Sequence, residues 1–521
     1  MNILCVVLVF IGVTLSVHEN LTTATNNDTS EDVFLEAINR HKYSTTTPKY
    51  LWQTFDEVIN ESRADGGVGI SIENIMDSWT NEAGNPIVYA DRIDRDIRLK
   101  QIPMSIATSS ASNFARTSPV ECMGEKKTYI SAGDSVSFVS NVQQNGFYRI
   151  KYDSHSCHLL ISALYEKNYS KLHVTNRAQL IDDALNLARA TKISYDKTFE
   201  CTDYLRNEKE YLPWKAFFNG INFLLQRSYG QQDNLTSVIK SYILHLTSKI
   251  YSSLDFENSI DDDHLKQLKR ELILTWRCKA EGKDCVKKAK QLYINLKLNT
   301  FMGLPNHISP NARAAVYCTA MRDADVNEWN FMWGQYLKAD FASEKKTILE
   351  ALGCNRNEKI LRSYINRAIS GSYTSDIRKQ DVDIALTSIY NAGKVGVDVM
   401  LIFLVNEYKR LYEYYGEWNS VRNVFSKLAS HISTQQQLKD LEMIGNCLKQ
   451  YMPEISFELD KTVETARTNH NWYVVNANNI FKELNSTVSM WDARLNAKIN
   501  LNSFSIISVT IFTIITYVLS H

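Results

Sequence analysis

Apolar residues three and four positions apart dominate the chain after residue 153. In the stretch RAQLIDDALNLARA this spacing places apolar side chains on one helical face, namely Leu180, Ile181, Ala184, Leu185 and Ala188. The opposite face is predicted to carry Asp182, Asp183 and Asn186, pointing away from the core. Similar helices recur at short intervals to about residue 491, with no strict sequence period. The pattern predicts an α-α superhelix of HEAT- or armadillo-like helix pairs rather than one large core.

Residues 75–152 have a different texture. Short β-branched runs such as PIVYADRI, SVSFVS and GFYRIKYD alternate with turn residues, which predicts a small antiparallel β-sandwich of roughly 80 residues. Residues 31–65 return to helical spacing. The predicted fold class is therefore mainly α with a small β-sandwich.

Composition supports this assignment. Glycine (19) and proline (8) are scarce among the 521 residues, and no proline lies between Pro310 and Pro453, as expected of an uninterrupted helical array. Basic and acidic residues balance at 58 each, so nothing indicates a polyanionic partner such as nucleic acid.

Both ends of the chain carry targeting patterns. An apolar run from Ile3 to Val13 predicts a signal peptide over residues 1–17. The apolar tail from Phe504 to Leu519, with no basic residue after it, predicts a glycosylphosphatidylinositol (GPI) attachment signal over residues 496–521, with Asp492 or Asn496 as the attachment residue. A short C-terminal membrane anchor is the alternative.

Six acceptor sequons also suit an exported protein: Asn20, Asn27, Asn60, Asn168, Asn234 and Asn485. Together with the two terminal patterns, they predict a GPI-anchored location on the extracellular face of the plasma membrane.

The eight cysteines outside the signal peptide permit disulfides in such a compartment. Cys278 and Cys285 flank the tight loop KAEGKD, which suits a short bridge between two helix ends. A zinc site is the rival interpretation, although the chain has no C-x-x-C pair and no histidine cluster near this loop.

Other candidate chemistry is weak. His18-Glu19 would need a second histidine at Thr22 to form a His-Glu-x-x-His zinc site, and none of the 11 histidines has another four residues on. Three further groups read more simply as surface or packing residues. They are the metal candidates His155, Cys157 and His158, the carboxylates Asp261, Asp262 and Asp263 at a solvated helix start, and the helix-packing aromatics Trp329, Phe331, Trp333 and Tyr336.

Several motifs in order resemble the aminopeptidase N family of zinc metallopeptidases (gluzincin aminopeptidases). IENIMDSWTNEAGNPIVYADR and VQQNGFYRIKYD resemble the start and the closing strand of that family's β-sandwich domain. NRAQLIDDALNLARA and YLPWKAFFNGINFL, with Tyr211, Pro213 and Trp214, resemble its C-terminal helical domain. EAINRHKYSTTTPKYLW resembles the last helices of its catalytic domain. The resemblance covers residues 31–491.

The resemblance implies two disulfides, Cys278–Cys285 and Cys318–Cys354, because CKAEGKDC, ISPNARAAVYCTA and ILEALGC match the family's bridged segments. Cys157 stands where family members often have tryptophan, and Cys122 where an aromatic residue is expected. The sequence assigns no pairing to Cys122, Cys157, Cys201 or Cys447.

The resemblance also implies a domain order. It comprises a signal peptide (1–17), a helical remnant of the catalytic domain (18–65), the β-sandwich (66–153), the superhelical domain (154–495) and the lipid-anchor signal (496–521). The family's zinc site and its Gly-x-Met-Glu-Asn strand have no match, so we expect no catalytic residue, no metal ligand and no cofactor in this chain, whereas complete members hold zinc.

Three functions follow as alternatives. The chain is a non-catalytic homologue that binds peptides or proteins at the cell surface, the C-terminal half of a split zinc aminopeptidase, or part of an incompletely assembled gene for such an enzyme. The apolar residues of segment 31–60 are expected to fold onto the sandwich or to mediate association with a second copy or a catalytic subunit.

Overall fold

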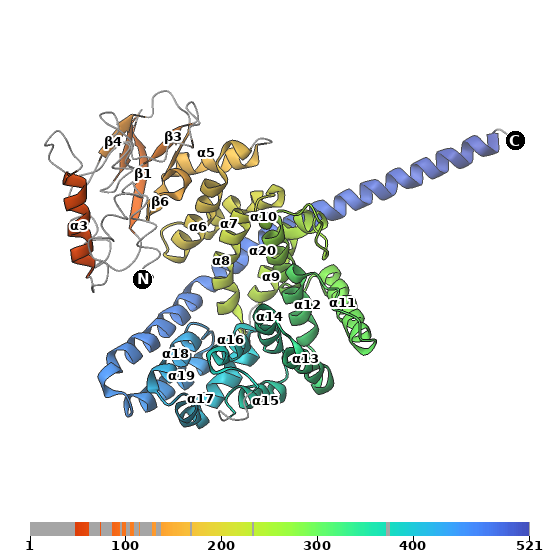
Figure 1. The fold of residues 1–521 in the computed structure, drawn as a ribbon. Helices are drawn as coiled ribbons and strands as arrows, with labels where there is room; N and C mark the ends of the chain where they lie inside the picture. Colours follow the sequence, from red (N-terminus) through yellow and green to blue (C-terminus); the bar gives the residue numbers. More distant parts are fainter. Residues whose placement is uncertain are drawn as a thin grey trace. The chain divides into compact units, whose positions relative to one another are not determined.

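The computed structural model describes residues 47–61, 73, 86–93, 96–99, 105–108, 114, 128–131, 137–166, 169–231, 234–370 and 376–519. These residues belong to two compact units, 1–194 and 195–521 (Figure 1). The predictions for residues 1–46, including the signal peptide, lie outside the described residues, and so does Cys122.

The first unit contains two small sheets. One has the strand order β4-β2-β1-β6 and the other pairs β3 with β5. The strands are β1 (Ile87–Ile93), β2 (Asp96–Leu99), β3 (Ile106–Thr108), β4 (Thr128–Ser131), β5 (Phe138–Ser140) and β6 (Arg149–Tyr152). Val88 of β1 and Ile150 of β6 lie opposite each other and are fully buried.

The predicted antiparallel arrangement is wrong for one pair, since β1 and β6 run parallel. Alternating apolar residues report which face of a strand is buried and not the direction of its neighbour. The chain between β1 and β6 is long enough to include four other strands, so β6 can enter the sheet in the same direction as β1.

Helix α3 (Pro48–Glu61) confirms helical structure in the segment before the sheets. Trp52 and Phe55 are buried with their ring centroids 6.2 Å apart, whereas Tyr50 remains 60% exposed. Two of the aromatic side chains expected to need cover are thus covered within this chain.

Helices α5 (Ser154–Tyr165) and α6 (Val174–Arg189) complete the first unit. The prediction that Asp183 faces away from the core is wrong, because its side chain is buried. One carboxylate oxygen lies 3.2 Å from the Arg149 guanidinium, and the other accepts the backbone N–H of Ile150 at 3.1 Å. Asp183 therefore fixes the position of β6 against α6, a long-range contact that helical periodicity does not encode.

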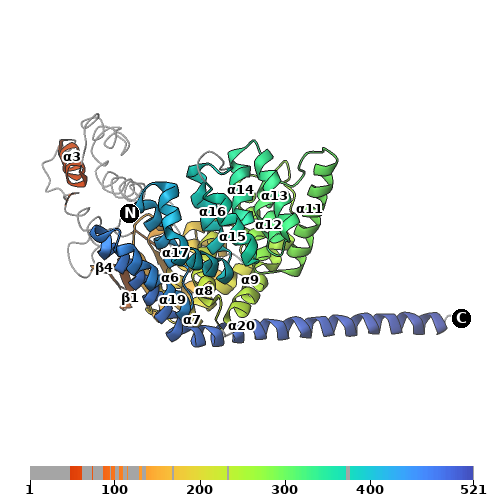
Figure 2. The ribbon, with the colours of Figure 1, turned by 90° about the horizontal axis from the view of Figure 1, so that it is seen from below.

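The second unit is a helical array that follows the predicted pattern. Helices α10, α12, α14, α16, α18 and α20 contact one another in that order, and α11, α13, α15 and α17 each contact the next helix along the chain (Figures 1 and 2). This is the arrangement of an α-α superhelix, in which each helix pair buries its face on its neighbours.

The helices of this array are short except for α17 and α20. Their bounds are α7 (Tyr195–Asp203), α8 (Tyr211–Ser228), α9 (Leu235–Ser252), α10 (His264–Lys279), α11 (Lys283–Phe301), α12 (Pro310–Met321), α13 (Val326–Lys338), α14 (Ala342–Leu352), α15 (Glu358–Ala368), α16 (Val382–Asn391), α17 (Lys394–Tyr415), α18 (Trp418–Ala429), α19 (Gln435–Lys449) and α20 (Ser456–Leu519).

Gly353 allows α14 and α16 to approach closely. A Cβ atom at this position would lie 2.0 Å from Ser388 Oγ and 2.6 Å from the Ser388 carbonyl carbon, so a larger residue would force the helices apart. The buried aromatics Trp329, Trp333 and Tyr336 pack nearby, which confirms their predicted role in helix packing.

Among the described residues, none of the helices is both long and apolar enough to cross a membrane. Asp492, one predicted attachment residue, lies within α20, and its carboxylate is 2.9 Å from His245 Nε2. The side chain of Asn496 is outside the described residues.

Candidate functional site: a basic cavity in the helical array

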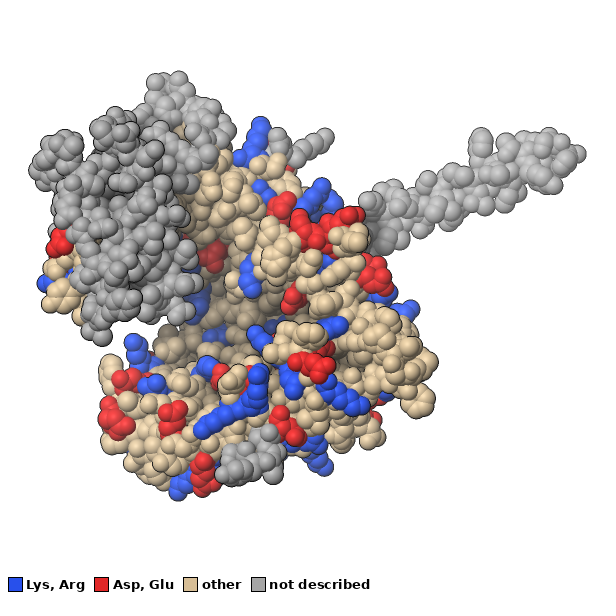
Figure 3. Space-filling view, viewed as in Figure 1, with Lys and Arg blue, Asp and Glu red and all other residues tan. Residues whose placement is uncertain are grey.

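A cavity of about 490 Å³ opens among the helices of the second unit. Six basic and two acidic side chains line it: Lys240, Lys279, Arg322, Lys346, Arg356, Lys427, Glu350 and Asp383. Half-cystines Cys278, Cys318 and Cys354 and the polar residues Thr387, Ser388 and Asn391 form further parts of the wall. In the view of Figure 3, basic and acidic side chains are interspersed over the helical array.

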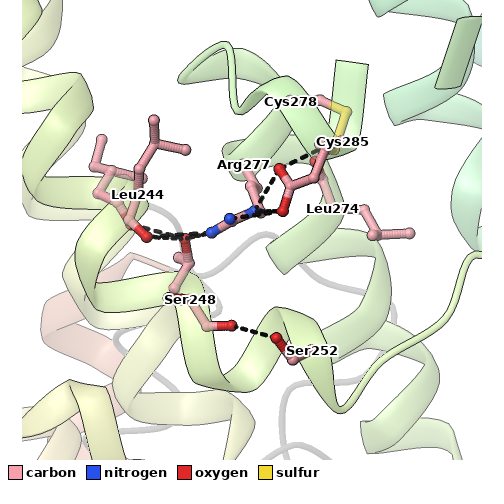
Figure 4. Close-up of polar contacts among 10 residues, drawn as sticks. Leu244, Ser248, Ser252, Leu274, Arg277, Cys278 and Cys285 are labelled. Carbon is pink, nitrogen blue, oxygen red and sulfur yellow. Dashed lines mark hydrogen bonds and ion pairs between the residues drawn. A yellow bond between two sulfur atoms is a disulfide. The ribbon is translucent and has the colours of Figure 1, made fainter. Parts of the chain in front are cut away.

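The disulfide Cys278–Cys285 closes the α10–α11 turn at one side of this cavity. Its S–S distance is 2.08 Å, and both sulfurs are buried. Beside the bridge, the Arg277 guanidinium donates to both carboxylate oxygens of Asp284 and to the Leu244 carbonyl of α9 (Figure 4). The end of α10 is thereby held to both α9 and α11.

The second disulfide, Cys318–Cys354, joins α12 to the residues after α14, with an S–S distance of 2.05 Å. Both bridges implied by the family resemblance are therefore formed. They hold the segments that carry the cations of the cavity, because Lys279 follows Cys278 directly, Arg356 lies two residues after Cys354, and Arg322 lies one helical turn after Cys318.

Lys279 stands at the C-terminal end of α10. Its Nζ lies 4.7 Å from the centroid of the Trp276 ring and donates to Asn222 Oδ1 at 3.2 Å. Burial lowers the pKa of Lys279 from 10.5 to about 8, and the charges of Arg322 and Lys240 add to the effect.

Arg322 lies against the same turn. Its Nη2 donates to the Cys278 carbonyl at 3.1 Å, and burial together with the Arg356 charge lowers its pKa. Within the described residues, neither Arg322 nor Lys279 forms an ion pair within 4.0 Å. Glu281, whose charge acts on Arg322, is already shared by Lys240 and Arg356.

Glu281 shows the strength of the local positive field. Burial would raise the pKa of its carboxyl group, but hydrogen bonds from Arg356 and Lys240 outweigh burial and lower the pKa to about 2. The group is therefore ionised at any physiological pH, and the cavity still keeps a surplus of positive charge.

The opposite wall comes from α16 and α18. Asp383 pairs with Lys427 at 2.5 Å. His431 follows α18 and does not itself line the cavity, and its Nε2 lies 2.7 Å from Asn391 Oδ1, which does. Burial lowers the pKa of His431 to about 4, so its imidazole is neutral at pH 7. This wall supplies polar groups without adding an uncompensated charge.

Among the residues that the structure describes, no group of three or more His, Cys, Asp or Glu side chains is placed so that it could hold a metal ion. His155 and His158 are exposed on α5, as predicted. Zinc therefore has no fitting site among these residues, and the expectation of no metal and no catalytic residue stays a prediction.

The acidic residues before α10 differ in part from the predicted solvated helix start. Asp263 caps α10 by accepting the Lys266 N–H at 2.6 Å, but Asp262 is not solvated. Its carboxylate is buried against Arg270 and Lys266, and these partners hold its pKa below the usual value. Asp262 thus neutralises the buried guanidinium of Arg270.

Two of the six sequons have described side chains. Asn234, directly before α9, and Asn485, in α20, are both exposed. The side chains of Asn20, Asn27, Asn60 and Asn168 lie outside the described residues.

Sequence reasoning missed the basic cavity. Its cations come from α9, α10, α14, α18 and the residues after α12 and α14, each separated from the next by 10 residues or more, and so they form no local motif. The available signal was that Lys279, Arg322 and Arg356 each follow a half-cystine within four residues, since bridged cysteines bring their neighbours together.

Comparison with known proteins agrees with this architecture. Residues 138–468 match the family described as "ERAP1-like C-terminal domain", which covers more than half of the chain. The chain is 26% identical over 436 residues to aminopeptidase N of Plutella xylostella, covering 78% of this chain and 45% of the relative. It is 27% identical over 484 residues to the thyrotropin-releasing hormone-degrading ectoenzyme of Rattus norvegicus, covering 85% and 43%.

Human aminopeptidase N is 24% identical over 478 residues, covering 85% of this chain and 48% of the relative. The chain thus spans less than half the length of each of these curated relatives. On the match to the family and the agreement of fold, the chain belongs to the ERAP1-like C-terminal domain family, which corresponds to the C-terminal region of aminopeptidase N proteins.

Proposed function

We propose that this chain is a cell-surface, aminopeptidase N-like protein without peptidase activity of its own, and that its basic cavity binds the acidic end of peptides. The observation that carries the proposal is the excess of positive charge in the cavity, above all the half-buried guanidinium of Arg322, which has no carboxylate partner among the described residues. The relatives are named as aminopeptidases and as a hormone-degrading ectoenzyme, which makes peptides the ligand class to test first.

A peptide carboxylate suits this cavity because a buried cation without a partner gains more from an anion than an exposed one does. A charge-assisted hydrogen bond contributes roughly 1.5–3 kcal/mol, which corresponds to about 10- to 100-fold in affinity. Arg322 supplies such donors beside the Cys278 carbonyl, and the cavity of about 490 Å³ can hold one or two residues.

The test compares one fluorescent peptide library with free C-terminal carboxylates and the same library with amidated C-termini, by anisotropy. Free acids are expected to bind at least about 10-fold more tightly, and Arg322→Gln is expected to remove that difference. The control is Lys290→Gln, which changes an exposed lysine of α11 that does not line the cavity. Equal binding of acids and amides to the unmodified protein would refute the proposal.

Absence of peptidase activity is tested separately. Purified protein is expected not to hydrolyse alanyl or leucyl amides, because the sequence offers no His-Glu-x-x-His site. Turnover that a chelator abolishes, together with about one zinc per chain by elemental analysis, would contradict this part of the proposal.

A second candidate function is supported by length. Because the chain spans less than half of each relative compared above, it is also suited to act as the C-terminal half of a zinc aminopeptidase whose catalytic half is a separate chain. Co-purification of this chain with a zinc-containing partner, and a gain of amide hydrolysis on mixing, would favour this candidate over the first.

We also propose the domain order and GPI anchoring given by the sequence. The support is the apolar tail from Phe504 to Leu519 and the two exposed sequons at Asn234 and Asn485. Phosphatidylinositol-specific phospholipase is expected to release the protein from cells. Retention with the C-terminal peptide still attached would favour the alternative of a membrane anchor.

A further inference from the structure

Lys279 differs from the other lysines of the cavity. Lys240 lies 3.0 Å from Glu281, Lys346 lies 3.9 Å from Glu350, and Lys427 lies 2.5 Å from Asp383. In the described part of the chain Lys279 has no such acid, and its amine donates to the amide oxygen of Asn222 instead.

The charges that act most strongly on Lys279 are basic. Lys240 of α9 and Arg322, directly after α12, repel its charge, and the ring of Trp276 in its own helix covers one side of the amine. The acids Glu350 and Asp383 line the same cavity and are paired with Lys346 and Lys427. Trp276 is held in place because its ring stacks on Phe218 of α8 at 4.7 Å. The Trp276 ring and Asn222 Oδ1 hold the amine in place and favour its protonated form, but burial and the charges of Arg322 and Lys240 outweigh them and lower its pKa.

The effect on the amine is large. With the pKa of Lys279 lowered to about 8, about 20% of the amine is neutral at pH 7.4, whereas an ordinary lysine with a pKa of 10.5 is less than about 0.1% neutral. The nucleophilic form is thus strongly enriched relative to that of an exposed lysine. A lysine made nucleophilic by burial and by neighbouring cations is the group that proteins use to form imines with carbonyl compounds.

We propose that Lys279 is a nucleophilic amine that forms a reversible imine with small carbonyl compounds carrying an anionic group, such as a carboxylate or a phosphate. The cavity provides the space, and Arg322 and Lys240 provide cations for the anionic group. This covalent chemistry goes beyond peptide binding and does not depend on it.

The reaction needs no oxidant or reductant. The Nζ lone pair attacks the carbonyl carbon and forms a C–N bond, while a proton passes from nitrogen to the carbonyl oxygen to give a carbinolamine. Loss of water from the carbinolamine then gives the C=N bond, and addition of water reverses the sequence. Asn222 Oδ1, which accepts a hydrogen bond from Nζ, orients the amine.

The experiment uses the full chain and pyridoxal 5′-phosphate as the probe, followed by borohydride reduction and peptide mapping. Lys279 is expected to be labelled at least about 50-fold faster than the exposed Lys290, with half-maximal labelling near pH 8 rather than above pH 10. Labelling spread over the lysines according to their exposure would overturn the proposal.

Two variants sharpen the result. Lys279→Arg keeps the positive charge and is expected to lose the label at this position, with thermal unfolding and disulfide mapping used to show that the variant is folded. Arg322→Gln removes a cation that lowers the pKa of Lys279, so it is expected to slow labelling by both probes; the slowing should be about 10-fold greater for pyridoxal 5′-phosphate than for pyridoxal, which has no phosphate. Equal slowing for both probes would refute the role of Arg322 in binding the anion.

Glyoxylate serves as a third probe and distinguishes carboxylates from phosphates as the anionic group. Peptide binding by the unmodified protein is measured in parallel. A chain that forms the imine at Lys279 but does not distinguish peptide acids from amides would refute only the proposed function, and the reverse result would refute only this inference.

Discussion

The two disulfides are expected to contribute unequally to stability because they close loops of different lengths. Cys318 and Cys354 are 36 residues apart, whereas Cys278 and Cys285 are only 7 apart. A crosslink lowers the entropy of the unfolded chain by an amount that grows with the logarithm of loop length. This relation gives about 3.8 kcal/mol for the long loop and about 2.4 kcal/mol for the short one.

Local contacts keep the native turn in place in the variant. The turn closed by Cys278 and Cys285 is also held by the hydrogen bonds from Arg277 to Asp284, so the loss of the short bridge should act through the unfolded chain and not through a rearranged turn. Replacing each pair with alanine in separate proteins should therefore destabilise the second unit by about 4 kcal/mol for the long loop and by about 2 kcal/mol or less for the short one.

Urea denaturation followed by tryptophan fluorescence measures this difference, because seven of the nine tryptophans lie in the second unit. The two double variants serve as controls for each other, and non-reducing peptide mapping first establishes that the remaining bridge is intact. Equal losses in the free energy of unfolding, or a larger loss for the short loop, would refute the argument from loop length.

Three further predictions concern pH and redox state. Burial raises the pKa of Asp183 to about 7, so the native first unit keeps a proton that the unfolded chain releases near pH 4. The free energy of unfolding of this unit should therefore fall as pH rises from about 4 to about 7. Hydrogen exchange of β6 peptides measures this fall, and Asp183→Asn should flatten it. Burial lowers the pKa of His431 to about 4, so the unfolded chain binds a proton that the native chain does not. Protection of α18 peptides from hydrogen exchange should therefore fall as pH drops from about 6.5 to about 4. His431→Gln should remove this pH dependence. A change of stability with pH in the opposite direction in either unit would show that the burial assigned to Asp183 or His431 is wrong. Alkylation without reductant should leave Cys278, Cys285, Cys318 and Cys354 unmodified, and modification of any of them would contradict the disulfide assignment.

Periodicity alone was sufficient to predict most of the second unit. The helical spacing after residue 153 and the absence of proline between Pro310 and Pro453 gave a helical array, and successive helices do pack as pairs. Such patterns succeed because each amphipathic helix records in its own sequence which face it buries.

Tertiary structure decided where the polar groups point. Asp183 has the spacing of a solvated residue, yet it is buried because Arg149 and the Ile150 N–H lie opposite it. Asp262 is buried for the same kind of reason, against Arg270. A partner more than 30 residues away, or on another element, leaves no trace in local periodicity.

The pairing of β1 with β6 and the basic cavity share this physical origin. The cavity gathers Lys240, Lys279 and Arg322 from segments that lie far apart in the sequence, and the low pKa of Lys279 arises only when the fold brings these charges together and partly buries the amine. The sequence by itself determined the helices, the segment of short strands and the cysteines available for bridging. Only the fold decided which charges are left without a partner, because charge compensation depends on distances in space rather than on distances along the chain.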